Sequence, residues 1–236
     1  MDKNQFVSNI QKYYLGGLVE SVKWDMTKDK TEVKFLSTEN SMAGSIVYPF
    51  STDEEKTIGV YNTTELLKIL SVMGDEVTVD FEKTRGTYLK MIIADLFYRG
   101  TYSLADIGSI PEAPEIDEPS TYDVTFDLTP QFKDQFMKAY KALGSINRFT
   151  IEASDTIKIV LGDKASYSNK ISFNTESFEY LPLAEKAFSA QALFEILKLK
   201  TTETGKIHVS DEGLMKVELS DEVSKSNYFL VELEEV

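Results

Sequence analysis

The residue types that could perform catalysis are few in this sequence and do not form a recognisable constellation. His208 is the one histidine of the chain, and it lies in a strand-like segment, Lys206 to Val209, where a structural role is expected. No serine–histidine–aspartate arrangement can be assembled around it. Gly205-Lys206 lacks the glycine-rich run of a phosphate-binding loop. The acidic runs Asp53 to Glu55 and Asp211-Glu212 are expected in solvated turns, so no catalytic or metal site is predicted.

Lysine is the residue type whose distribution suggests a function. Four helices are expected, over residues 2–14, 62–73, 129–143 and 189–200, and they hold eight basic residues and four acidic ones, a sum of +4. The rest of the chain holds 17 basic and 35 acidic residues, a sum of −18. The basic residues of the expected helices are Lys3, Lys12, Lys68, Lys133, Lys138, Lys141, Lys198 and Lys200.

Helical periodicity places these lysines opposite the apolar faces. Phe132 and Phe136 begin an apolar stripe on helix 129–143, and Lys138 and Lys141 lie on the other side of it. Lys12 and Lys68 are expected in the same outward position on their own helices. Outward lysines attract nucleic-acid phosphates without reading sequence. The aromatic residues of the helices are expected on the buried faces, which argues against a platform for stacking bases. An ordinary solvated helix surface is the alternative interpretation.

The sequence segments that must position these lysines occur twice in the chain. Phe6, Ile10 and Tyr14 recur at a constant offset of 126 as Phe132, Phe136 and Tyr140. Three further segments, beginning at 32, 61 and 88, recur in the same order at offsets of 124 to 127. Such a long period indicates a duplicated domain rather than a solenoid repeat.

Each copy is predicted to contain a helix, several strands, a second helix and further strands. Gly16-Gly17 ends the first helix, and Lys28-Asp29-Lys30 is expected at a hairpin tip. Asn62 and Glu65 match a reciprocal capping box. The fold class is therefore predicted to be α+β, dominated by antiparallel strands with helices on one side.

Three domain segments follow from this pattern. Residues 1–105 form the first domain, 121–236 form the second, and 106–120 connect them. The connector holds three prolines, five acids and no basic residue, which favours an extended and solvated chain. It also contains Ile107 and Ile110, which an exposed linker does not require.

The bulk composition is that of a globular chain with a strong acidic balance. The 236 residues carry a formal charge of −14 and include no cysteine, so no disulfide or thiolate–metal framework is available. No signal peptide and no membrane-spanning segment are expected. An acidic total argues against nucleic-acid binding, but the basic helices reverse that argument.

Taken together, these residues resemble a sliding clamp, the polymerase processivity factor of tailed phages that is related to the proliferating cell nuclear antigen. The carriers of the resemblance are Val60 to Ser71, the helix 129–143 followed by Arg148 to Ile151, the connector, and the closing Asn227 to Leu233. The resemblance implies duplicated clamp domains with antiparallel sheets outside and two helices per domain lining a ring. It also implies a homotrimer around duplex DNA, a DNA polymerase and an ATP-dependent clamp loader as partners, no cofactor, and the host-cell cytoplasm as location.

The resemblance assigns roles to particular residues. The DNA-facing set would be Lys12, Lys68, Lys133, Lys138, Lys141 and Lys198, although Glu195 occupies the position that corresponds to Lys68. Partner peptides would dock near Met42, Ile107, Ile110 and Leu230, for each of which core packing is the alternative. The alternative functions are a non-ring, β-rich binding or virion structural protein built by duplication, and an enzyme with an acidic metal site.

Overall fold

The structure is a computed structural model, and it describes residues 1–50, 52–144, 146–162, 168–175, 180–199, 204–221 and 224–234. The chain divides into two compact units. The first consists of Met1–Thr38 and Gly44–Ala113, and the second of Glu39–Ala43 and Pro114–Val236.

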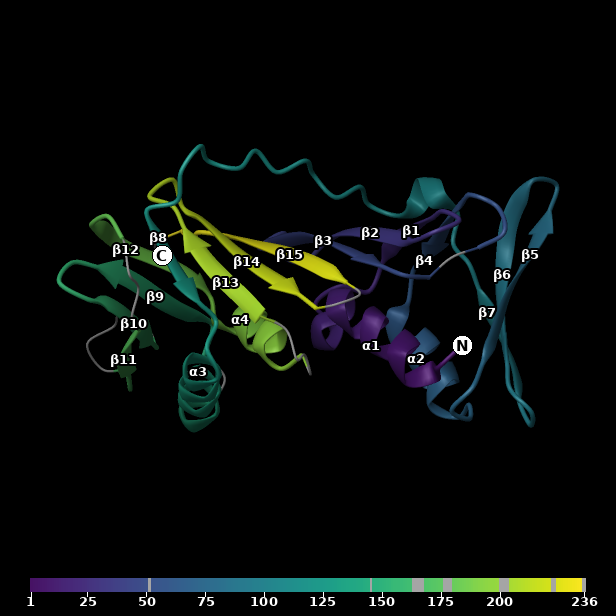
Figure 1. Ribbon diagram of the computed structural model, residues 1–236, viewed down its shortest axis with the longest axis horizontal. Coiled ribbons are helices and arrows are strands. Elements are labelled where there is room, and N and C mark those ends of the chain that lie inside the picture. Colours follow the sequence, from purple (N-terminus) through teal and green to yellow (C-terminus); the bar gives the residue numbers. More distant parts are fainter. Residues whose placement is uncertain are drawn as a thin grey trace. The chain divides into compact units, whose positions relative to one another are not determined.

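The first unit contains two α-helices and two antiparallel sheets. Its strands have the orders β4-β1-β2-β3 and β5-β6-β7. Helices α1 and α2 contact each other and lie on one side of β1, β2 and β4 (Figure 1). The elements are α1 (Lys3–Tyr14), β1 (Val22–Met26), β2 (Thr31–Leu36), β3 (Met42–Tyr48), β4 (Lys56–Val60), α2 (Thr63–Ser71), β5 (Thr78–Thr84), β6 (Thr87–Ala94) and β7 (Arg99–Ser103), with short 3-10 turns at Leu15–Gly17 and Ile107–Ser109. The first two residues of β3, Met42 and Ala43, belong to the second unit.

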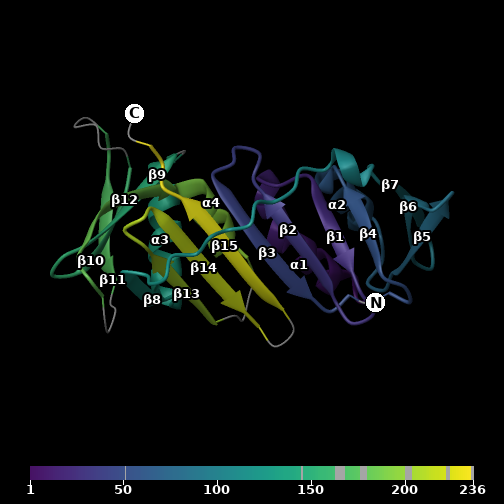
Figure 2. The same ribbon diagram turned by 90° about the horizontal axis from the view of Figure 1, so that it is seen from above.

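The second unit repeats this plan. Its strands have the orders β12-β9-β10-β11 and β15-β14-β13-β8, again antiparallel. The elements are β8 (Val124–Asp127), α3 (Pro130–Leu143), β9 (Arg148–Ala153), β10 (Ile157–Leu161), β11 (Ile171–Thr175), β12 (Leu183–Ser189), α4 (Ala190–Leu197), β13 (Thr204–Val209), β14 (Leu214–Ser220) and β15 (Lys225–Val231). Viewed from above, β13, β14 and β15 run side by side (Figure 2).

The duplication predicted from the residue spacing is present in the topology. Strand β1 begins at Val22 and β9 at Arg148, 126 residues later, and α2 begins at Thr63 and α4 at Ala190, 127 residues later. The strand orders of the two units correspond as well. In the first unit, an antiparallel bridge joins Asp2 to Glu76.

Side-chain caps fix the starts of the helices. The carboxylate of Asp2 accepts a hydrogen bond from the Gln5 amide, and the Thr129 hydroxyl accepts one from the Phe132 amide, directly before Pro130 at the first turn of α3. The cap at Asn62 differs from the predicted reciprocal box. Asn62 does accept from the Glu65 amide, but its own amide donates to the Tyr102 hydroxyl, 3.0 Å away, and not to Glu65.

Large aromatic side chains form the core of each unit. In the first, Trp24 of β1 meets Phe6 of α1 edge-on with ring centroids 5.8 Å apart. In the second, Phe136 of α3 meets Phe149 of β9 edge-on at 5.2 Å. These contacts bury the apolar face of each first helix on its sheet, which is the expected solution for an amphipathic helix.

The predicted fold class is confirmed: the protein is α+β, with antiparallel sheets and, over the described ranges, four α-helices. The predicted hairpin tip is also correct, because β1 and β2 pair antiparallel with Met26 opposite Thr31 across Lys28 to Lys30. In the part of the chain that the structure describes, no helix has the length and apolar character needed to cross a bilayer.

Candidate nucleic-acid interface

Two of the predicted lysines are exposed and make no ion pair. Lys68 lies in the last turn of α2, and Lys141 lies in the last turn of α3. No acidic group of the described residues lies within ion-pair distance of either ammonium. These two side chains are the most available cations on the helices.

Two other predicted lysines are exposed but carry a carboxylate partner on their own helix. Lys138 pairs with Asp134 at 2.8 Å, and Lys198 pairs with Glu195 at 2.8 Å. Both side chains of the Lys138 pair are exposed, and an exposed pair at this spacing contributes only about 0.3–0.5 kcal/mol and is screened by salt. Their local charge is nevertheless largely cancelled, which the count of lysines alone does not reveal.

The expectation that Lys12 faces outward is wrong. Lys12 is 2% exposed, and Asn9, one turn earlier, is also buried. Helix α1 is thus buried over a wider arc than its apolar stripe, which consists of Phe6, Ile10 and Tyr13. The position opposite an apolar stripe faces solvent only if the helix is covered on a single side. Helix α1 is covered on more than one side, so Lys12 is buried.

Lys133 is held at the end of a neighbouring helix. Its Nζ donates a hydrogen bond to the carbonyl oxygen of Leu199, 3.0 Å away, just beyond the end of α4. In the first unit, Lys3 Nζ donates in the same way to the carbonyl oxygen of Met73, 2.8 Å away, beyond α2. A cation satisfies the free carbonyls and the negative dipole at a helix C-terminus, so both lysines have a structural role. Lys200 lies outside the described residues.

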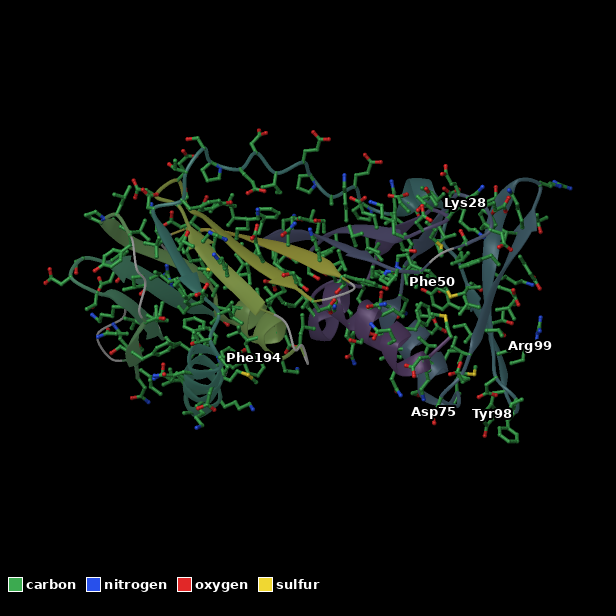
Figure 3. The ribbon with its side chains drawn as sticks, in the orientation of Figure 1. Lys28, Phe50, Asp75, Tyr98, Arg99 and Phe194 are labelled. Carbon is green, nitrogen blue, oxygen red and sulfur yellow. The ribbon has the colours of Figure 1, made fainter. Side chains whose placement is uncertain are left out.

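One aromatic residue of α3 and one of α4 are less buried than predicted. Tyr140 and Phe194 are half-buried and stack on each other, with ring centroids 4.2 Å apart and an interplanar angle of 18°. Phe194 is marked on α4 in Figure 3. Burial raises the pKa of Tyr140, and the charge of Glu195 adds to the effect. This stack joins the two helices.

His208 of β13 lies close to side chains of both neighbouring strands, β8 and β14. Its Nδ1 lies 2.9 Å from the Thr125 hydroxyl, and its Nε2 lies 3.6 Å from a carboxylate oxygen of Glu218. Burial lowers its pKa, although the Glu218 charge opposes this. No cluster of metal-binding side chains occurs among the described residues.

The arrangement of strands and helices has counterparts among solved structures, whereas no family model and no curated protein matches the sequence. PCNA of A. fulgidus, solved with the C-terminal region of FEN-1 bound, matches with a TM-score of 0.76 at 16% identity. That match covers 100% of this chain and 98% of that one. This chain has the fold of PCNA. The proliferating cellular nuclear antigen from Entamoeba histolytica matches with a TM-score of 0.73 at 17% identity, and the match covers 99% of this chain and 97% of that one. The PCNA2–PCNA3 complex from Sulfolobus tokodaii matches with a TM-score of 0.69 at 15% identity, and the match covers 98% of this chain and 97% of that one.

Within the PCNA fold of this chain, the predicted peptide-docking residues differ in exposure. Met42 and Leu230 are fully buried and belong to the second unit. Ile110 is also buried, in the first unit, where it packs against Gly59 of β4. These three therefore have the core-packing role that was the alternative interpretation, and Ile107, which is 38% exposed, is the one accessible member of the set.

Ion pairs that the sequence did not predict hold the connector of this PCNA fold. On the first unit, Glu112 accepts from Lys23 Nζ at 2.8 Å, and the lysine lowers the pKa of that carboxyl. On the second unit, Glu118 accepts from Lys216 Nζ at 2.8 Å and from the Tyr122 hydroxyl at 3.1 Å. Burial alone would lower the pKa of Lys216, but its hydrogen bonds to Glu118 and Glu218 raise it. The connector is therefore attached rather than fully solvated, and no local pattern indicates such pairs.

Proposed function

We propose that this protein is a DNA sliding clamp, a ring that encircles duplex DNA and keeps a replicative polymerase on its template. The observation that carries the proposal is the duplicated PCNA fold, matched over essentially the whole of both chains. Such a protein performs no catalysis and needs no cofactor. It acts by topological linkage, which raises the effective concentration of the polymerase at the primer end.

Three chains would supply the six clamp domains of a closed ring. Strand β7 is hydrogen-bonded to β6 as its neighbour in the first unit, and β11 is bonded to β10 in the second, so each is an edge strand within its sheet over the described residues. An unpaired edge is a template for another strand. Pairing of β7 of one chain with β11 of the next is a head-to-tail contact, which closes when the symmetry is cyclic. The proposed assembly is therefore a homotrimer.

The DNA-facing residues in this proposal are Lys68 and Lys141, together with the exposed and ion-paired Lys138 and Lys198. They would contact backbone phosphates without sequence preference. Lys12 is not included because it is buried. Ile107 is retained as a contact for partner peptides, and an ATP-dependent loader would open the ring. A tailed-phage origin, with action in the host cytoplasm, is part of the same proposal.

The native mass tests the ring. Light scattering over a wide concentration range is expected to give a mass near three times 26.7 kDa at high concentration. A strict monomer at every concentration would contradict the ring and would favour a non-ring binding protein.

The lysines provide a second test. Lys138→Glu with Lys141→Glu should abolish stimulation of the cognate polymerase, because the altered α3 would repel phosphates, while circular dichroism stays unchanged. Full stimulation by the double variant would refute the assigned DNA face.

A further inference from the structure

Three consecutive apolar side chains stand exposed at the turn between β6 and β7. Leu96 is 94% exposed, Phe97 is 87% exposed and Tyr98 is 56% exposed. Single exposed apolar residues are common on protein surfaces, but a contiguous group of this size marks an interaction site. Tyr98 is labelled at this turn in Figure 3.

The turn is held in one conformation by Asp95. Its Oδ1 accepts hydrogen bonds from the Phe97 amide at 2.7 Å and the Tyr98 amide at 2.5 Å, and its Oδ2 accepts from the Gly74 amide beyond α2. The Asp95 amide also donates to the Tyr98 carbonyl oxygen at 2.9 Å. The apolar group is thus presented on a fixed support, so docking it loses little conformational entropy.

In the second repeat, the described residues at the corresponding place form two similar hydrogen bonds. Asp221 lies 126 positions after Asp95, its Oδ1 accepts from the Ser224 amide at 2.6 Å, and its amide donates to the Ser224 carbonyl oxygen at 3.1 Å. In sequence, Leu96, Phe97 and Tyr98 correspond there to Glu222, Val223 and Ser224. Two of the three are polar, so the turn itself does not require three large apolar side chains.

The two turns also differ in their exposure to solvent. Ser224 is 4% exposed, whereas its counterpart Tyr98 is 56% exposed. The strands that follow show the same contrast: most of β15 is buried, but three of the five residues of β7 are exposed. The surface that is covered in the second repeat is therefore uncovered in the first, and it continues directly into the edge strand β7.

We infer that Leu96, Phe97 and Tyr98 form an apolar knob that docks on a second copy of this chain. This inference rests on the proposed ring. The knob leads into β7, and the proposed partner strand β11 offers the half-exposed side chains of Ile171 and Phe173 beside its edge. Rigid aromatic anchors next to a strand pairing are the residue types that dominate interface energetics.

The second repeat supplies the variant that tests the knob. Leu96→Glu, Phe97→Val and Tyr98→Ser together graft the sequence of the second turn onto the first while Asp95 is kept. Sedimentation and light scattering are measured from nanomolar to high micromolar concentration, alongside the wild type and the control Leu89→Ser, an exposed residue of β6 away from the turn. The graft is expected to need at least about 30-fold more protein for half-assembly, and the control to match the wild type.

Each outcome separates the knob from the ring. If the wild type and the graft assemble equally well, the knob is overturned and the ring stays intact. If that graft also loses polymerase binding, the knob is a contact for the polymerase instead. A wild type that stays monomeric overturns both. If the graft loses its circular dichroism signal, Phe97→Ser alone is measured, and unchanged assembly of that variant likewise overturns the knob.

Discussion

The Nζ of Lys133 donates a hydrogen bond to the carbonyl oxygen of Leu199, which joins the first turn of α3 to the end of α4. Lys3 and Met73 form the same contact between α1 and α2. A lysine on the first helix of each unit therefore caps the second helix. The helical lysines thus include two that hold helices together, Lys3 and Lys133, besides the exposed ones that could meet a phosphate.

Replacing a capping lysine should reduce stability. Lys133→Met removes the donor and leaves the Leu199 carbonyl to water, so the free energy of unfolding is expected to fall by about 1 kcal/mol. Urea denaturation measures this. Lys141→Met is the matched control on the same helix and should change stability by less than about 0.5 kcal/mol. Equal effects of the two variants would show that the capping bond contributes nothing.

The salt dependence of DNA binding should distinguish the exposed lysines. Lys68→Gln and Lys141→Gln are each expected to lower the slope of log K against log salt by about 0.9, because each removes one phosphate contact. Lys198→Gln should lower it less, since Glu195 already occupies that ammonium. Filter binding or fluorescence anisotropy on a short duplex gives the slopes, and identical slopes for the wild type and the Lys141 variant would remove that residue from the DNA face.

Tyr102 should stabilise the start of α2 through its hydroxyl. That group accepts from the Asn62 amide and donates to the Asn62 carbonyl oxygen, 3.2 Å away. Tyr102→Phe keeps the buried ring and loses both bonds, so a loss of about 1–2 kcal/mol is expected in urea unfolding. Asn62→Ala should cost a similar amount through the lost side-chain cap. If Tyr102→Phe is as stable as the wild type, water replaces the hydroxyl without penalty.

His208 should make stability fall in mildly acidic solution. Burial holds its folded pKa below the usual 6.5, so the unfolded state binds more protons once the pH drops through that value. Stability is therefore complete above about pH 7 and declines as the pH falls from 6.5 toward the lower folded pKa. Urea unfolding at pH 8, 6 and 5 tests this against His208→Asn, which has no histidine and should lack the decline over this range.

Periodic and local features of the fold were predictable from the sequence, because they depend on residues close together in the chain. The recurrence of Phe6 and Ile10 as Phe132 and Phe136 identified the duplication, and Pro130 identified the start of α3. The cap at Asn62 was predicted only in half, since its second partner, Tyr102, lies 40 residues away.

The site was predicted less completely than the fold, because the environment of a lysine depends on distant segments. A helical wheel places Lys12 opposite an apolar stripe but does not show what covers that side, and Lys12 is buried. Likewise, the spacing of Lys133 does not indicate a carbonyl 66 residues away. Lys68 and Lys141 were found because their own helices determine their exposure.

Retention on end-blocked DNA tests the proposed clamp most directly. The protein is threaded onto linear duplex DNA at high concentration, both ends are then blocked by bound protein, and the complex is washed in high salt. A ring is held by topology, which salt does not weaken, whereas phosphate contacts are lost steeply as salt rises. An encircling clamp is expected to stay on the end-blocked duplex and to leave as soon as one end is freed by restriction cleavage. Equal loss from blocked and free DNA would contradict encirclement.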